Sequence, residues 1–92
     1  VPEKMIWNAL DGGVQQHETK ATMISFWDDA KSEALRIDLW TKDMPVDQMK
    51  MFFHQMFVSL GDTYQRATGE DDVADWIKDM AEEFAVKSAI KM

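Results

Sequence analysis

A change of hydrophobic period between residues 33 and 68 constrains the fold of this chain more than any other feature. Residues 35–40 alternate strictly, with Leu35, Ile37 and Leu39 on one side, which is the period of a half-buried strand. Further along, apolar residues recur at helical spacing, namely Met49, Phe52, Phe53, Met56, Phe57, Leu60 and Tyr64. The sequence therefore predicts a strand that leads into a long helix, with apolar residues on both.

The residues before this stretch predict further strands. Residues 5–10 predict a short strand, the Asp11-Gly12-Gly13 run a turn, and residues 14–19 a loop or an irregular edge. Residues 20–27 are rich in β-formers and alternate, which favours a strand, and residues 28–33 form a polar hairpin loop. Because a one-residue slip would exchange the two faces of a strand, we expect Phe26 opposite Leu35, Ile24 opposite Ile37, and Thr22 opposite Leu39.

Two helices are predicted in the second half of the chain. The first begins between Met44 and Gln48 and runs to about Ala67, with Gly69 as the stop, and Asp43 or Asp47 caps it or favours the positive end of its dipole. Gly61 lies inside this helix, which indicates close packing or a slight bend. Asp71 or Asp72 caps the second helix, whose apolar stripe comprises Val73, Trp76, Ile77, Met80 and Phe84.

Together these elements predict an α+β fold, in which two antiparallel helices pack on one face of an antiparallel sheet of three or more strands. Residues 1–92 are expected to form one domain, and a further edge strand upstream of Val1 is left open. This two-layer sandwich would bury one common core, comprising Leu35, Ile37, Leu39, Phe53, Phe57, Leu60, Trp76 and Met80.

Composition argues against several classes of partner and chemistry. The net charge of −7 opposes binding to a nucleic-acid backbone or an anionic membrane surface. The chain has no cysteine, which excludes disulfides and thiol catalysis. No apolar run approaches the ~20 residues of a membrane span, and no signal peptide is recognisable. We therefore expect a soluble cytoplasmic protein without direct membrane insertion, although the start at Val1-Pro2 leaves a processed upstream segment open.

No group of side chains predicts catalysis. His17 and His54 are the only histidines, and neither has metal-ligand spacing with a partner. The serines lack a nucleophile-elbow motif, and the clusters of carboxylates lack the layout of a calcium loop. We therefore expect no enzymatic activity, no metal and no cofactor, and we interpret His54 as a polar flank of the helical stripe.

The second face of the predicted hairpin is a candidate interaction surface. The expected register places Met23, Trp27, Arg36, Asp38 and Trp40 on it, and tryptophan and arginine are enriched at interface hot spots. The competing interpretation is that both tryptophans only cover the sheet, beneath the loop at residues 11–19 or an upstream strand. Contact with a ligand is a third alternative.

The chain also resembles a known family. LRIDLWTKDMPVD at residues 35–47, FFHQ at residues 52–55 and DTYQRATG at residues 62–69 are similar to GldC, the gliding motility-associated protein of Bacteroidetes bacteria, and the similarity continues upstream through most of the chain. Departures occur at Met51 and Met56 and in the second helix, where relatives often carry a cysteine. The resemblance implies an accessory, cytoplasmic role in gliding without enzymatic activity.

Two classes of function follow. The first is an interaction module that contacts components of the gliding machinery, with a homodimer left open. The alternative is a protein that binds a small apolar ligand between helices and sheet, among Met and Phe side chains. A ligand site requires a cavity of several hundred cubic ångströms, whereas an interaction module presents an exposed apolar patch.

Overall fold

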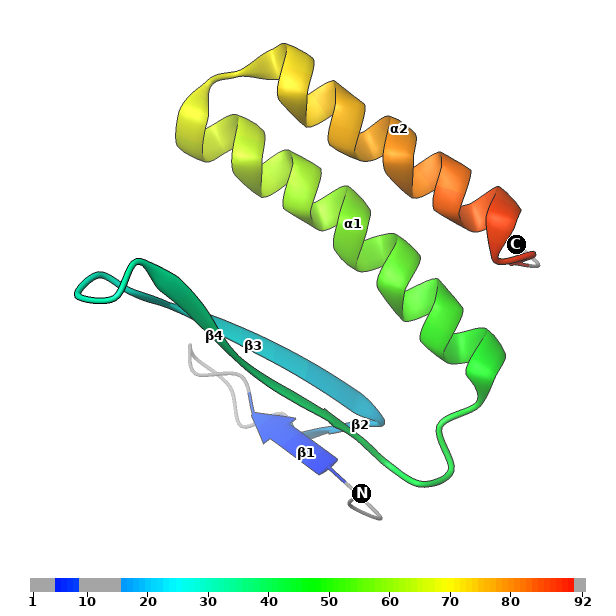
Figure 1. Cartoon of the computed structure of the whole chain (residues 1–92). Coiled ribbons are helices and arrows are strands. Elements are labelled where there is room, and N and C mark those ends of the chain that lie inside the picture. Colours follow the sequence, from blue (N-terminus) through cyan, green and yellow to red (C-terminus); the bar gives the residue numbers. More distant parts are fainter. Residues whose placement is uncertain (1–4, 9–15, 91–92) are drawn as a thin grey trace. The chain divides into compact units, whose positions relative to one another are not determined.

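The computed structural model describes residues 5–8 and 16–90. The elements follow in the order β1 (Met5–Asn8), β2 (Gln16–Thr19), β3 (Ala21–Asp28), β4 (Glu33–Trp40), α1 (Val46–Thr68) and α2 (Asp71–Lys87) (Figure 1). They fall into two compact units, residues 1–44 with the strands and residues 45–92 with the helices. The single domain expected from the sequence stays a prediction.

The β3–β4 hairpin has the predicted register. Phe26 lies opposite Leu35, Ile24 opposite Ile37, and Thr22 opposite Leu39, so the pattern of apolar residues determines the pairing. On the turn side both strands extend beyond the predicted bounds, β3 by one residue and β4 by two, and β3 begins one residue later than predicted, so the turn occupies residues 29–32. The carboxylate of Asp28 accepts hydrogen bonds from the backbone N–H groups of Ala30 and Lys31, and Ser32 adopts a positive φ of 51°. Local hydrogen bonds therefore stabilise this turn.

The remaining strands correct the sequence-based expectation. Residues 16–19, predicted as a loop or irregular edge, form β2 and pair antiparallel with β1. Among the described residues the strands make two separate two-stranded sheets, β1–β2 and β3–β4, and not one sheet of three or more strands. Residues 16–19 are polar and lack the apolar alternation from which a strand is predicted. The strand forms nevertheless, because backbone hydrogen bonds do not require apolar side chains. The turn predicted at residues 11–13 lies outside the described residues.

Helix α1 begins and ends where the sequence predicts. Pro45 occupies the N-cap position and Asp47 lies in the first turn, where its charge favours the helix dipole. Gly69 follows the helix with φ of 72°, and its N–H donates to the carbonyl of Gln65 at 2.8 Å. Asp43 does not cap the helix, since its carboxylate accepts a hydrogen bond from Thr41. The N-cap proline and the left-handed glycine together set the bounds of α1.

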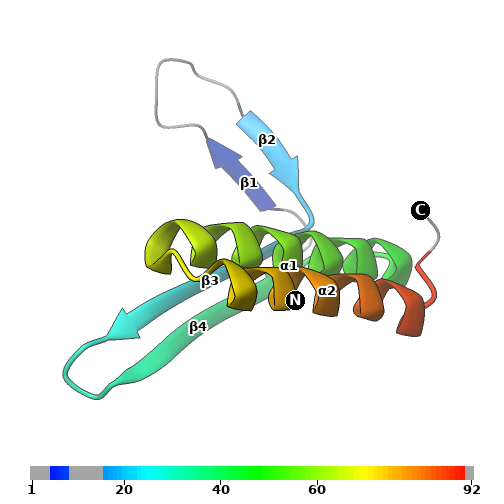
Figure 2. The same ribbon diagram turned by 90° about the horizontal axis from the view of Figure 1, so that it is seen from above.

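Helix α2 packs antiparallel to α1 along a seam of small residues (Figures 1 and 2). Glu70, and not Asp71 or Asp72, occupies the N-cap position, and no side chain caps the helix. Gly61 of α1 is buried, as are Ala74, Ala81 and Ala85 of α2. A Cβ atom on Gly61 would lie 3.3 Å from the carbonyl oxygen of Ala74 and 2.9 Å from Cγ of Lys78. Close packing, one of the two predicted reasons for Gly61, is therefore confirmed.

Phenylalanine rings extend the seam toward the C-terminal end of α2. The ring of Phe84 lies with its centroid 5.1 Å from that of Phe57 and 6.3 Å from that of Phe53. Phe53 also contacts Phe52 and Phe57 edge-on. These distances are typical of favourable aromatic pairs. The cluster therefore links α1, which carries Phe53 and Phe57, to α2, which carries Phe84.

Within each unit taken by itself, most residues of the predicted common core are not fully buried. Leu35, Ile37 and Leu39 remain 45–51% exposed, Leu60 is 51% exposed, and Trp76 is 64% exposed. Phe53, Phe57 and Met80 are half-buried. In the helical unit α2 directs alanines toward α1, which leaves Trp76 beside the seam, and its place in a core shared with the sheet stays a prediction. The small residues Ala74, Ala81 and Ala85 form the buried set that the sequence analysis missed.

The seam predicts a steric effect at Gly61. We expect Gly61→Val to lower the free energy of unfolding by about 1–3 kcal/mol, because a branched side chain would overpack the contact with Ala74. Ser59→Val, at an exposed position of the same helix, serves as the matched control. Denaturant unfolding of both variants measures the difference, and equal stabilities would contradict the close contact.

The aromatic cluster predicts a cavity effect at Phe84. Removal of its ring in Phe84→Ala should cost about 3 kcal/mol, the lower end of the range for phenylalanine, because the side chain is half-buried. Val86→Ala is the control, since Val86 is 80% exposed. Thermal melts that show the same stability for both variants would rule out Phe84 as a packing residue.

Candidate interaction surface on the β3–β4 hairpin

The β3–β4 hairpin has two chemically different faces. Alternate residues point to opposite sides of a strand, so the register assigns each residue to a face. One face, here called the aliphatic face, contains Thr22, Ile24, Phe26, Leu35, Ile37 and Leu39. The other, here called the tryptophan face, contains Ala21, Met23, Ser25, Trp27, Ala34, Arg36, Asp38 and Trp40.

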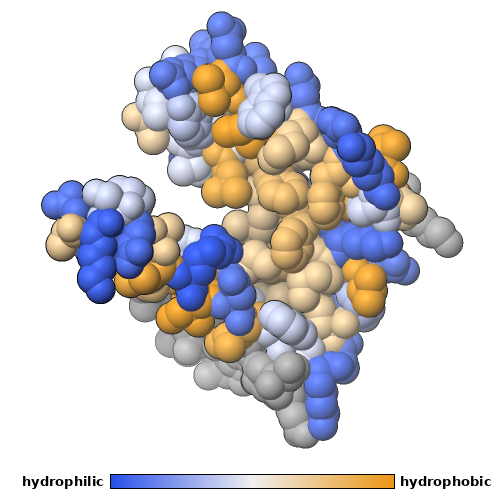
Figure 3. All heavy atoms as spheres, viewed as in Figure 1, coloured by the Kyte–Doolittle hydropathy of each residue, from blue (hydrophilic) through white to orange (hydrophobic). Residues whose placement is uncertain are grey.

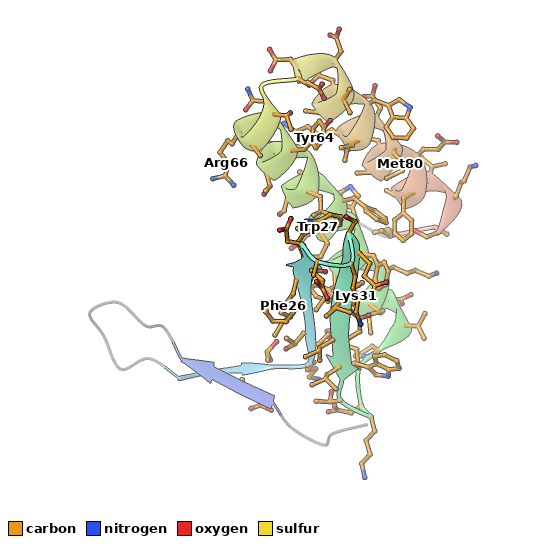
Figure 4. The ribbon with its side chains drawn as sticks, turned by 60° about the vertical axis from the view of Figure 1, so that its left-hand side comes forward. Phe26, Trp27, Lys31, Tyr64, Arg66 and Met80 are labelled. Atoms are coloured by element: carbon orange, nitrogen blue, oxygen red, sulfur yellow. The ribbon has the colours of Figure 1, made fainter. Side chains whose placement is uncertain are left out.

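All five predicted surface residues therefore share the tryptophan face, but not one compact patch. Trp27 lies opposite Ala34 next to the turn, whereas Trp40 lies opposite Ala21 at the other end. Trp27 lies level with position 34, which is six steps along β4 from Trp40. At about 3.4 Å per residue the two tryptophan positions are therefore roughly 20 Å apart. Figure 4 labels Trp27 and its neighbour Phe26 near the turn. The two tryptophans therefore bracket the surface.

A polar group occupies the centre of the tryptophan face. The guanidinium of Arg36 donates one hydrogen bond to the hydroxyl of Ser25 across the sheet and another to the carboxylate of Asp38 at 3.0 Å. The side chains of Arg36 and Asp38 are 49% and 40% exposed. An ion pair this exposed contributes little to stability, but with Ser25 it restrains the Arg36 guanidinium, whose register position lies between those of the two tryptophans.

Exposed apolar groups occur on both faces. Trp27 is 67% exposed and Trp40 46% exposed, and Phe26 on the aliphatic face is 55% exposed. In Figure 3, apolar side chains are visible on the surface of the units in the view shown. An exposed stretch of large apolar residues on a hairpin marks a surface suited to contact with another surface.

The turn that follows β4 fixes the end of this surface. The N–H of Thr41 donates to the carbonyl of Lys20 at 2.8 Å, and its buried hydroxyl donates to the carboxylate of Asp43 at 2.7 Å. The ammonium of Lys20 lies 3.6 Å from the same carboxylate. The Thr41 hydrogen bond, aided by Lys20, lowers the pKa of Asp43 below its ordinary value. Sequence analysis did not single out Thr41.

The DTYQRATG stretch has an evident structural role in the helical unit. Tyr64 donates a hydrogen bond to the carboxylate of Glu70, which raises the pKa of Tyr64. The amide of Gln65 donates to Asp71 at 3.0 Å. Asp62 lies 2.6 Å from the ammonium of Lys78, and this contact raises the lysine pKa. These side chains link the end of α1 to the start of α2, on either side of the Gly69 turn.

Candidate sites for chemistry are sparse in the described part of the chain. His54 is 13% exposed, and its Nε2 lies 3.7 Å from the Glu82 carboxylate without a hydrogen bond. An open hollow of about 270 Å³ lies beside the helices, lined by Phe57, Met80, Glu83, Phe84 and Lys87. Among the described residues no group of three or more histidines and carboxylates has the arrangement of a metal site.

No described helix is both long and apolar enough to cross a membrane.

Comparison with known proteins places the chain in a family. The family of gliding motility-associated proteins described as GldC-like matches residues 2–90. The chain belongs to the GldC-like family. No curated protein and no solved structure matches it. For this GldC-like chain, the match confirms the resemblance that the motifs in β4, α1 and the interhelical turn indicated, and it associates the fold with gliding motility.

The lowered pKa of Asp43 predicts a specific loss of stability in acid. A carboxylate whose folded pKa lies below its unfolded value contributes stability that is present above the unfolded pKa and lost as pH falls through the folded pKa. The unfolded value is near 3.8, so the melting temperature of the parent should fall as pH decreases from 5 through about 3. In Asp43→Asn the melting temperature should fall slightly less over this pH range than it does in the parent.

Asp29→Asn is the matched control, because Asp29 is an exposed carboxylate in the β3–β4 turn. Thermal melts over the same pH series compare the two variants. If both curves flatten equally, the Thr41 and Lys20 contacts do not set the acid response of Asp43.

Proposed function

We propose that this chain is a non-enzymatic accessory protein of the bacterial gliding motility machinery and acts through protein–protein contacts made by the tryptophan face. Family membership over residues 2–90 supports the association with gliding. The observation that carries the contact mechanism is the arrangement of two exposed tryptophans around Arg36 on one hairpin face. We further propose a Bacteroidetes source and a cytoplasmic location, as the resemblance implies.

The chemistry of this face suits a protein partner. A tryptophan ring contributes a large rigid contact area, and an arginine contributes several directional hydrogen bonds. Arg36 is held by Ser25 and Asp38 in an extended position on the sheet, so less side-chain entropy is lost on binding than for an unrestrained arginine. The net charge of −7 makes nucleic acid a poor partner.

The helices add a second argument for a protein partner over a small ligand. The hollow beside Phe57, Met80 and Phe84 measures about 270 Å³ and is open to solvent, whereas sites for small molecules are typically enclosed and measure ~300–1,000 Å³. Ligand binding at this hollow therefore lacks support. The apolar surface of the hairpin is extended along a strand and better fits a flat protein surface.

The two-layer sandwich remains part of this proposal. An isolated two-stranded hairpin with apolar residues on both faces is marginally stable at best, so both faces gain from cover. A single layer of helices covers one face of a sheet. If the aliphatic face is the covered one, as the sequence predicts, the tryptophan face is the one left for a partner.

A crosslinking pull-down from a gliding bacterium that encodes this chain tests the proposal. The tagged chain should capture proteins whose deletion abolishes gliding, and Trp40→Ala should reduce their capture by about ten-fold or more, because a tryptophan at a hot spot contributes on the order of 2 kcal/mol. Trp40→Ala should retain the circular dichroism and melting behaviour of the parent.

Trp76→Ala provides a matched control, since Trp76 is an exposed tryptophan on α2 and not on the hairpin. It should keep both the captured proteins and the gliding of complemented cells. Unchanged capture by Trp40→Ala would refute the tryptophan face as the contact, and unfolding of that variant would indicate that Trp40 only covers the sheet. Normal gliding after deletion of the whole chain would refute the motility role.

A further inference from the structure

Among the described residues, no strand pairs with the outer edge of β4. In the described part of the chain, β4 pairs only with β3, although it extends over eight residues, Glu33–Trp40. A strand edge of this length is a template for pairing with another strand. Sheets of two strands gain stability when further strands are added, so an additional strand at this edge would stabilise the hairpin.

The sequence of β4 is complementary to itself when two copies run antiparallel around Ile37. In this register Ile37 faces Ile37 of the second copy, and Leu35 faces Leu39. Arg36 faces Asp38 and, by symmetry, Asp38 faces Arg36. At the ends Ala34 faces Trp40, so the small side chain lies beside the large one. Odd-numbered residues face odd-numbered ones, and even-numbered residues face even-numbered ones. Each face of one hairpin therefore continues into the same face of the other.

Charge complementarity at the centre favours this register. Arg36 already contacts Asp38 of its own strand at 3.0 Å, and the guanidinium has further N–H donors. In the paired form two arginines and two aspartates alternate around the two-fold axis, so each charge has an opposite charge beside it and across from it. Opposite charges directly across an antiparallel pair are stabilising, and like charges are destabilising.

We infer that the chain forms a symmetric homodimer in which the β4 edges of two copies pair antiparallel around Ile37 and give a four-stranded β3–β4–β4–β3 sheet. Each copy contributes the same surface, which is the usual arrangement of a two-fold dimer. The tryptophan faces then lie side by side on one surface of the joined sheet. This inference concerns self-association and does not depend on the motility role.

The edge of β3 is a weaker alternative. Two β3 strands centred on Ile24 would place Lys20 across from Asp28, which are also opposite charges. However, Lys20 contacts Asp43, and Asp28 accepts two backbone hydrogen bonds within the turn. Both groups are thus engaged at the ends of β3, whereas the charges of β4 lie at the centre of its edge.

A mixing experiment with two charge variants tests the register. In Arg36→Asp both central positions are acidic, and in Asp38→Arg both are basic. Each variant alone should self-associate at least about ten-fold more weakly than the parent in sedimentation equilibrium, because like charges face each other. An equimolar mixture should regain the mass of a dimer, since the acidic edge of one variant faces the basic edge of the other.

A cysteine crosslink tests the same pairing by a route that does not alter the charges. The chain contains no cysteine, so Ile37→Cys carries a single thiol, placed on the proposed two-fold axis where facing Cβ atoms are about 4.5–5.5 Å apart. Mild oxidation should convert most of this variant to a disulfide-linked dimer. Ile24→Cys is the matched control, because Ile24 faces Ile37 within the hairpin and lies at the centre of the alternative β3 pairing.

The outcomes separate the possibilities. Dimeric parent protein, recovery of the dimer in the mixture and efficient crosslinking only through position 37 support the inference. A parent that stays monomeric up to hundreds of micromolar overturns it, as does crosslinking through position 24 in preference to 37. If the charge variants do not fold, the crosslinking result alone decides. A dimer found without capture of gliding proteins would leave the inference standing and refute only the proposed function.

Discussion

The close approach of α1 to α2 at Gly61 is the contact on which the helical unit depends. With no side chain at this position, the helix backbones come near enough that a single methyl group would meet the carbonyl oxygen of Ala74 at 3.3 Å. Ala81 and Ala85 continue the same seam, and the Phe53, Phe57 and Phe84 rings fill the wider end. Because small residues occupy the seam, the larger apolar side chains of both helices lie at its margins. Leu60, Val73 and Trp76 are therefore exposed large apolar residues of this unit.

The sequence predicted elements and local pairings better than it predicted which residues are buried between the two helices. The ends of α1 followed from Pro45 and Gly69, since each has a backbone geometry that few other residues provide. The β3–β4 register followed from matching two apolar faces. Burial was harder to predict, because helical spacing assigns Trp76 and Leu60 to an apolar stripe without specifying which part of the stripe faces the other helix. Alanine has a weak apolar signal, so Ala74, Ala81 and Ala85 were overlooked, although their spacing of seven and four residues is typical of a helix seam.

The sequence was sufficient to predict which residues share the candidate surface, but not how far apart they lie on it. Alternation along β3 and β4 was sufficient to assign Met23, Trp27, Arg36, Asp38 and Trp40 to one face. Their order along that face depends on the register, which places the tryptophans at opposite ends with the Ser25–Arg36–Asp38 group between them. Neither hydrogen bond of Thr41 has a sequence motif: the one to Lys20 joins the ends of two strands, and the one to Asp43 is a local contact after β4. The family match indicates the biological process, and the surface indicates how the chain could take part in it.

The topology of the described elements also has a kinetic consequence. Every strand pairs with its neighbour in sequence, and the two helices are joined by a turn around Gly69 and Glu70. The most distant residues paired in the β3–β4 hairpin are Ala21 and Trp40. Loops of this length close quickly, and chains dominated by local contacts fold in microseconds to milliseconds. Contacts within each pair of elements therefore form fast, whereas a lasting β3–β4 hairpin requires cover of its apolar faces.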